Sequence, residues 1–121
     1  MILKKLFAAS QRESVAIDVD EAKRRLDAGD ALLVDVREAD EWRAGHVAGA
    51  THIPLGIVAS RASGLPKDRD ILVICRTGNR SAMAQERLEQ AGFTNITNVA
   101  GGMTAWAEQG YPVITGEGRA A

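Results

Sequence analysis

Short apolar runs that alternate with helical patterns restrict this chain to a narrow choice of folds. The clearest run is ILVI at 71–74, which is apolar throughout and therefore predicts a strand covered on both faces. A second run lies at 31–36, and weaker strand candidates lie at 15–17, 51–53 and 95–99. Because helical patterns separate these strands, we expect βαβ units that build a mainly parallel sheet.

The helical segments carry recognisable start and stop signals. Asp18 and Glu21 form a capping-box pattern at the start of the first segment. Ala84, Leu88 and Ala91 recur at helical spacing and predict one buried stripe. Helices are therefore expected at 19–28, 38–43, 55–62, 81–91 and 103–108. The predicted fold class is α/β, a three-layer sandwich whose sheet of about five strands is covered by helices on both faces.

The length of 121 residues suits one compact domain. We expect an N-terminal leader at 1–13, a domain at 14–114 and a flexible, polar tail at 115–121. In the leader, two lysines precede only four apolar residues at 6–9, too few for a signal-peptide core. No stretch reaches the roughly 20 apolar residues that a membrane-spanning helix needs.

Charge and cysteine content narrow the classes of partner. The 15 basic and 16 acidic side chains give a net charge of -1. This balance offers no electrostatic reason to expect nucleic acid or an anionic membrane as a partner. A single cysteine cannot form an internal disulfide. A reducing compartment is therefore expected, and we predict a cytoplasmic protein.

The single cysteine, Cys75, follows the strongest strand candidate and opens the segment CRTGNRS. Ligands of parallel sheets bind at the carboxyl ends of the strands, which is where this cysteine lies. Gly78 and Asn79 tolerate a curled backbone whose amides can converge on an anion, and a helix begins nearby. With Arg76 and Arg80 adding positive charge, the segment favours a thiolate nucleophile. The alternative is a cysteine that serves only as a small buried hydrophobic residue.

Other chemistry-bearing residues form weaker patterns. His46 and His52 lack the paired spacing of a zinc site, so we expect no metal and interpret both as structural, although a Cys–His pair stays open. Arg37 and Glu41 are spaced for a surface ion pair on one helix. Asp35 ends a buried run, and its carboxylate faces either the site or a structural partner.

Three segments in this order resemble the rhodanese, or sulfurtransferase, homology domain over about residues 14–112. The first, between 33 and 54, contains LVDVRE, EW, GHVAGA and IP; the second is CRTGNRS at 75–81; the third is VAGGMTAW at 99–106. The resemblance implies a helix-covered parallel sheet and an active loop whose cysteine accepts a sulfane sulfur as a persulfide.

Carried over by position, the resemblance makes Cys75 the catalytic nucleophile and gives Asp35 and Arg37 a role in supporting the loop. It implies a thiosulfate or persulfide donor, and cyanide, glutathione or a protein thiol as the acceptor, with no cofactor. The backbone that cradles the anionic sulfur belongs to Arg76, Thr77, Gly78, Asn79 and Arg80.

Two rival functions use a similar loop. Cysteine-dependent phosphatases and arsenate reductases resemble this segment, but their signature has five residues between the cysteine and the arginine. Here four residues separate Cys75 from Arg80, which predicts a smaller cradle that suits a sulfur atom. The second rival is a non-catalytic regulatory or sulfur-carrier module, since a fold alone does not fix a function.

Overall fold

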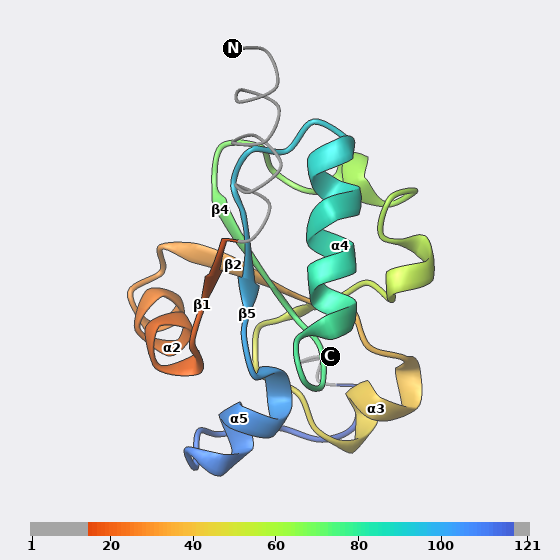
Figure 1. Cartoon of the computed structure of the whole chain (residues 1–121). Helices are drawn as coiled ribbons and strands as arrows, with labels where there is room; N and C mark the ends of the chain where they lie inside the picture. Colours follow the sequence, from red (N-terminus) through yellow and green to blue (C-terminus); the bar gives the residue numbers. More distant parts are fainter. Residues whose placement is uncertain (1–14, 118–121) are drawn as a thin grey trace.

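The computed structural model describes residues 15–117. A five-stranded, entirely parallel sheet with the strand order β1-β5-β4-β2-β3 forms its centre. Figure 1 shows the strands β1, β2, β4 and β5 in the middle of the molecule. The strands are β1 (Ala16–Ile17), β2 (Ala31–Asp35), β3 (Thr51–His52), β4 (Asp70–Ile74) and β5 (Ile96–Val99). All five coincide with predicted apolar runs, so the predicted parallel sheet is confirmed.

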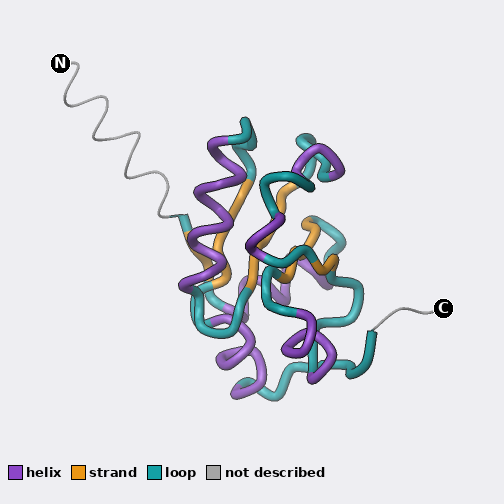
Figure 2. The backbone as a smooth tube through the Cα atoms, turned by 90° about the vertical axis from the view of Figure 1, so that its right-hand side faces the viewer, coloured by secondary structure: helices purple, strands orange, loops and turns teal. Residues whose placement is uncertain are grey.

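Helices cover both faces of the sheet. The helices α2 (Val19–Asp27) and α5 (Gly102–Glu108) pack together on one face. The helix α4 (Asn79–Gln90) covers the other face with two 3-10 turns, η2 (Leu55–Ile57) and η3 (Ala62–Gly64). The remaining helix is α3 (Ala39–Ala44). Figure 2 shows helices and turns on both sides of the strands, which confirms the three-layer α/β class.

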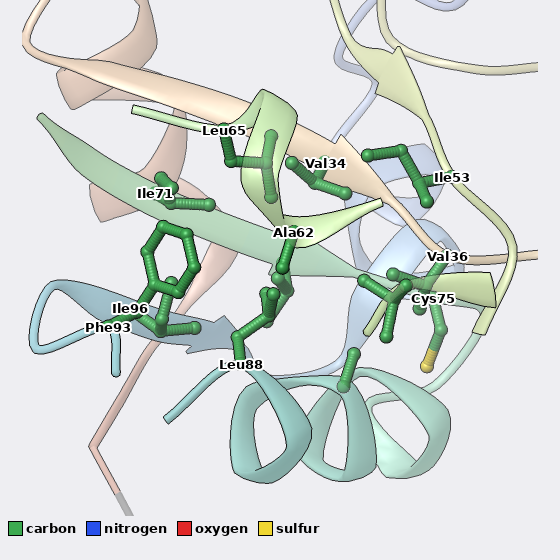
Figure 3. Packing of buried hydrophobic residues seen from close by; sticks show 13 residues of the cluster. Val34, Val36, Ile53, Ala62, Leu65, Ile71, Cys75, Leu88, Phe93 and Ile96 are labelled. Carbon is green, nitrogen blue, oxygen red and sulfur yellow. The ribbon is translucent and has the colours of Figure 1, made fainter. Parts of the chain in front are cut away.

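The central strand β4 divides the core because its side chains alternate between the two faces. Ile71, Val73 and Cys75 belong to the cluster beneath α4, part of which Figure 3 shows. Leu72 and Ile74 belong to the cluster beneath α2 and α5. All five side chains are at most 1% exposed. Cys75 therefore continues the alternation of a buried strand and enters the layer between the sheet and α4.

Local signals explain where the helices begin. The Asp18 carboxylate caps α2 by accepting the Glu21 amide at 2.9 Å, which is one half of the predicted capping box. The Glu21 carboxylate bonds Arg24 and Arg25 instead. The helix α4 begins at Asn79, two residues before the predicted start. Gly78 is its N-cap, and its φ of 113° lies in the left-handed region that favours glycine.

Two helical expectations are wrong. In place of one helix over 55–62, the structure has the short turn η2 at 55–57 and a separate turn, η3, that begins at residue 62. Gly56 and the β-branched Ile57 and Val58 are poor helix formers, which accounts for the interruption. In α4, Ala84 and Leu88 are buried as predicted, but Ala91 is exposed because the helix has ended by that position.

The C-terminal end of the described residues contacts α3. The Gly116 amide donates to the Arg43 carbonyl at 2.8 Å, and the Trp42 indole donates to the Glu117 carbonyl at 3.0 Å. The described part of the predicted tail is thus hydrogen-bonded to the domain. The predicted leader and residues 118–121 lie outside the described residues. Among residues 15–117, none of the helices has the length and apolar character needed to cross a membrane.

Candidate active site

The loop between β4 and α4 carries Cys75 at the carboxyl end of the central strand. Figure 3 shows its sulfur directed toward α4. The loop is short because Gly78 turns the chain directly into the helix. Arg76 and Thr77 are exposed, whereas Cys75 and Gly78 are buried. The Cys75 thiol therefore lies in the layer between the sheet and the N-terminus of α4.

Hydrogen-bond donors of the loop converge on this thiol. The Gly78 amide lies 3.0 Å from Cys75 Sγ, and the Ser81 hydroxyl lies 3.3 Å from the same atom. Burial raises the pKa of Cys75 and is the largest single influence on it. The hydroxyl of Ser81 and the amides of Ser81, Gly78 and Thr77 together outweigh burial, so the pKa of Cys75 is lowered from its usual value. The site favours the thiolate, which is the nucleophilic form.

At the start of α5, Gly101 is the N-cap and Gly102 is the first residue, and this end of the helix holds the active loop from the opposite face. The Met103 amide donates to the Cys75 carbonyl at 2.8 Å, and the Thr104 amide donates to the Arg76 carbonyl at 3.0 Å. A Cβ on Gly102 would lie 2.5 Å from the Cys75 carbonyl oxygen, closer than packing allows. Gly102 also has a φ of 55°. Glycine at position 102 is therefore a requirement of the close approach between α5 and the loop.

Arg80, in the first turn of α4, contacts an acidic partner from α3. Its Nη1 and Nη2 donate to the two carboxylate oxygens of Glu41 at 2.7 and 2.8 Å. This bidentate pair lowers the pKa of Glu41 to about 2, with a smaller contribution from the Glu38 amide. The expected Arg37–Glu41 surface pair is wrong, because Glu41 reaches across to the active loop instead.

Arg37 pairs with Asp35, and both side chains are buried. Arg37 Nη2 donates to Asp35 Oδ2 at 2.8 Å and to the Gly45 carbonyl at 2.7 Å, while the Arg37 amide donates to Asp35 Oδ1. Asp35 is paired in register with Ile74, the residue before Cys75. The carboxylate thus has a structural partner. Within residues 15–117, the side chains of Asp35 and Arg37 make no hydrogen bond to the active loop.

A hollow of about 590 Å³ lies at the other end of β4 and β5. It is lined by residues at the start of both strands and at the end of α4, including Asp70, Glu86, Phe93 and Ile96. None of its lining residues belongs to the active loop. The thiol cradle, which is built from backbone donors, is consequently a separate feature of the molecule.

Comparison with known proteins places this geometry in a family. A sequence model of the rhodanese-like domain matches residues 18–109, which is most of the chain. The chain belongs to the rhodanese-like domain family. A sulfurtransferase of Allochromatium vinosum is 40% identical over 103 residues, which cover 84% of this chain and 96% of that protein. A rhodanese-related protein of Thermoplasma volcanium, solved by crystallography, is 36% identical with a TM-score of 0.77. That match covers 83% of this chain and 97% of the solved chain.

A relative named as a sulfur carrier protein occurs in Bacillus subtilis. It is 38% identical over 91 residues, which cover 74% of this chain. The match covers 49% of that protein, so about half of the Bacillus protein lies outside it. The resemblance of the three sequence segments to the rhodanese family is thereby confirmed, and its relatives include one protein named as a sulfurtransferase and one named as a sulfur carrier.

In this rhodanese-like domain the histidines stack on a tryptophan next to the Asp35–Arg37 pair. Trp42 lies between His46 and His52, with ring centroids 3.5 and 4.7 Å from its own. His46 Nδ1 bonds the Trp42 carbonyl, and His52 Nε2 bonds the Arg37 carbonyl, both at 2.7 Å. These contacts are structural. The described residues contain no group of three or more side chains suited to a metal ion.

Two further residues contribute to the surroundings of the thiol, and neither is among the predicted site residues. Ser81 bonds the thiol from the third position of α4, and Asn98 of β5 bonds Ser81 in turn. Ser81 could have been found because it immediately follows Arg80 in the loop segment. Asn98 gives no such signal, because its neighbours in sequence form an ordinary strand.

Proposed function

We propose that this domain is a sulfurtransferase that carries a sulfane sulfur on Cys75. The observation that supports this most directly is the convergence of the Gly78 amide and the Ser81 hydroxyl on a buried thiol. Such donors stabilise a sulfur anion without any acid or base beside it. The family and the sulfurtransferase of Allochromatium vinosum agree with this assignment.

The proposed reaction has two displacement steps at sulfur. The Cys75 thiolate attacks the outer sulfur of thiosulfate, the S–S bond of the donor breaks, and sulfite leaves with the bonding electrons. Cys75 then holds a persulfide whose terminal sulfur is anionic. Cyanide or an external thiolate attacks that terminal sulfur, and the electron pair of the broken S–S bond returns to Cys75 Sγ. A persulfide donor enters by the same first step.

The loop backbone from Arg76 to Arg80 would hold the anionic terminal sulfur in this scheme. The Asp35–Arg37 pair would support the loop indirectly, by fixing the end of β2 beside β4. Because Cys75 is the chain's single cysteine, an external thiol or cyanide must complete the cycle.

Phosphatase chemistry fits the loop less well. A phosphate-binding loop needs an arginine whose guanidinium faces the oxyanion, whereas both terminal nitrogens of Arg80 bond the Glu41 carboxylate. The count of four residues between Cys75 and Arg80 also makes a small loop. A sulfur-carrier role is the second candidate, which the Bacillus subtilis relative favours. In that role the acceptor would be a protein thiol instead of a small molecule.

Steady-state assays separate these functions. We expect the protein to form thiocyanate from thiosulfate and cyanide, and we expect Cys75→Ser to abolish the product. Hydrolysis of an aryl phosphate by the native protein, without thiocyanate formation, would contradict the proposal. Persulfide formation without turnover to cyanide or glutathione would favour the carrier role.

The effect of the variant Arg80→Ala on thiocyanate formation needs a matched control, and an exposed arginine at the opposite end of β4 supplies it. Arg69 directly precedes β4, whereas Cys75 directly follows it. Arg69→Ala removes one positive charge from the protein without touching the loop. Thiocyanate formation should therefore stay close to the native rate in this variant, and an equal loss in Arg69→Ala and Arg80→Ala would show that only total charge matters.

A further inference from the structure

The Ser81 hydroxyl lies between two acceptors. Its Oγ is 3.3 Å from Cys75 Sγ and 2.6 Å from Asn98 Oδ1. The other end of the Asn98 amide, Nδ2, donates to the Gly78 carbonyl at 3.2 Å. Asn98 comes from β5, so a residue of the neighbouring strand touches both the N-cap of α4 and the hydroxyl beside the thiol.

The hydrogen-bond chemistry fixes the direction of each contact. A backbone carbonyl only accepts, so the amide nitrogen of Asn98 must face Gly78 and the amide oxygen must face Ser81. That oxygen also only accepts, so a hydrogen bond between it and Ser81 uses the proton of the Ser81 hydroxyl. A serine hydroxyl carries one proton. Ser81 can therefore donate to Asn98 or to a Cys75 thiolate, but not to both at once.

The two states of the thiol make different demands on this proton. A neutral Cys75 thiol is itself a weak donor, and Ser81 can then donate to Asn98 without loss. A Cys75 thiolate accepts strongly, and the bond from Ser81 to it is charge-assisted. Turning the hydroxyl toward the thiolate leaves the Asn98 oxygen without this donor.

We propose that Asn98 is a positioning residue that competes with the Cys75 thiolate for the single proton of Ser81. This inference rests on the proposed role of Cys75 as the nucleophile. Asn98 thereby opposes formation of the thiolate through Ser81, while its bond to the Gly78 carbonyl holds in place the residue whose amide faces the sulfur. The Asn98 side chain thus limits the ionisation of the thiol and also holds Gly78, whose amide faces the sulfur, in position.

Charged groups near the thiol are the same in every variant that tests this idea. Arg80 of α4 interacts with the charge of Cys75, and Glu41 of α3 pairs with Arg80. On β2 and the residues after it, Asp35 and Arg37 pair with each other. Because none of these groups is altered, their effects cancel when variants are compared.

The test is the pH dependence of Cys75 alkylation by iodoacetamide, a neutral reagent that modifies the chain's single thiol as the thiolate. Four proteins form a cycle: the native chain, Asn98→Ala, Ser81→Ala and the double variant. Ser81→Ala should raise the apparent pKa of Cys75 by about half a unit to one unit, because a donor is lost.

The cycle separates competition for the proton from simple loosening of the loop. Asn98→Ala should shift the apparent pKa downward by about half a unit more with Ser81 present than in the Ser81→Ala background. Equal shifts in both backgrounds, or a coupling of opposite sign, would overturn the proposal. If Asn98→Ala does not fold, as judged by thermal unfolding, Asn98→Leu keeps the size of the side chain and gives the same comparison.

Alkylation needs no sulfur transfer, so this test is independent of the proposed function. A coupling of the predicted sign in a protein that never takes up sulfur would support the competition and refute the sulfurtransferase. Sulfur transfer without the coupling would refute the role of Asn98 alone.

Discussion

Two arginine–carboxylate pairs beside the active loop differ in burial and in what they hold. Arg37 and Asp35 have side chains that are 7% and 1% exposed and lie two residues apart in sequence. Arg80 and Glu41 have side chains that are 32% and 26% exposed and join α4 to α3 across 39 residues. The first pair has little access to water, whereas the second can exchange its bonds for water. Pairs of the same chemistry therefore carry different weight in stability and in function.

The first pair also bonds the backbone. The Asp35 carboxylate accepts the Arg37 amide, and Arg37 donates to the Gly45 carbonyl. Removing one partner leaves a buried charge and broken backbone contacts, so the cost falls on the fold. The second pair restrains Arg80, one of the predicted loop residues. Loss of the Arg80–Glu41 pair should change the charge beside Cys75 more than it changes the stability of the domain.

The largest expected effect is the loss of the buried pair. Asp35→Ala should lower the free energy of unfolding by about 3–5 kcal/mol, because Arg37 stays buried without its carboxylate. Glu41→Gln is the control, and at its partly exposed site it should cost about 1 kcal/mol or less. Denaturation in urea measures both. Similar losses in the two variants would contradict the distinction between the pairs.

An intermediate effect concerns the charge of the donor. Glu41→Gln frees Arg80 from its neutralising partner, so kcat/KM for anionic thiosulfate should rise by about twofold to fivefold. Arg80→Ala leaves Glu41 unpaired and should lower the same constant. Neither variant should change kcat/KM for an uncharged sulfane-sulfur donor to a similar degree. Equal changes for both donors would show that the pair acts through loop geometry instead of charge.

The smallest expected effect is a change in stability at acidic pH. In the folded state the pKa of Glu41 is about 2, below its model-compound value of 4.5. A lowered folded pKa contributes stability above the unfolded value, and this contribution is lost as pH falls from 4.5 toward 2. The native protein should therefore lose its stability advantage over Glu41→Gln across that window. A difference between them that stays constant down to pH 2 would contradict this origin.

The sequence predicts those features of the site that depend on neighbouring residues. The apolar run of β4, the position of Cys75 at its end and the turn at Gly78 follow from local pattern, and the parallel sheet follows from the alternation of elements. The prediction of one helix over 55–62 is wrong because the low helix propensity of Gly56, Ile57 and Val58 outweighs the apolar spacing of this segment.

Contacts between distant segments were not predictable from pattern. The spacing of four residues predicts that Glu41 pairs with Arg37, yet Glu41 bonds Arg80 on another helix. Asn98 meets Ser81 because β5 lies beside β4, and the strand order is not encoded in any local motif. The glycine before Met103 is required by the close approach to the Cys75 carbonyl, which only the fold creates.

The intact mass of the protein after incubation with thiosulfate tests the central claim most directly. We expect that the native chain gains the mass of one sulfur atom, that cyanide removes it, and that Cys75→Ser gains none. A native chain that stays at its original mass with both thiosulfate and a persulfide donor would contradict the account. The same mass gain in Cys75→Ser would contradict it equally.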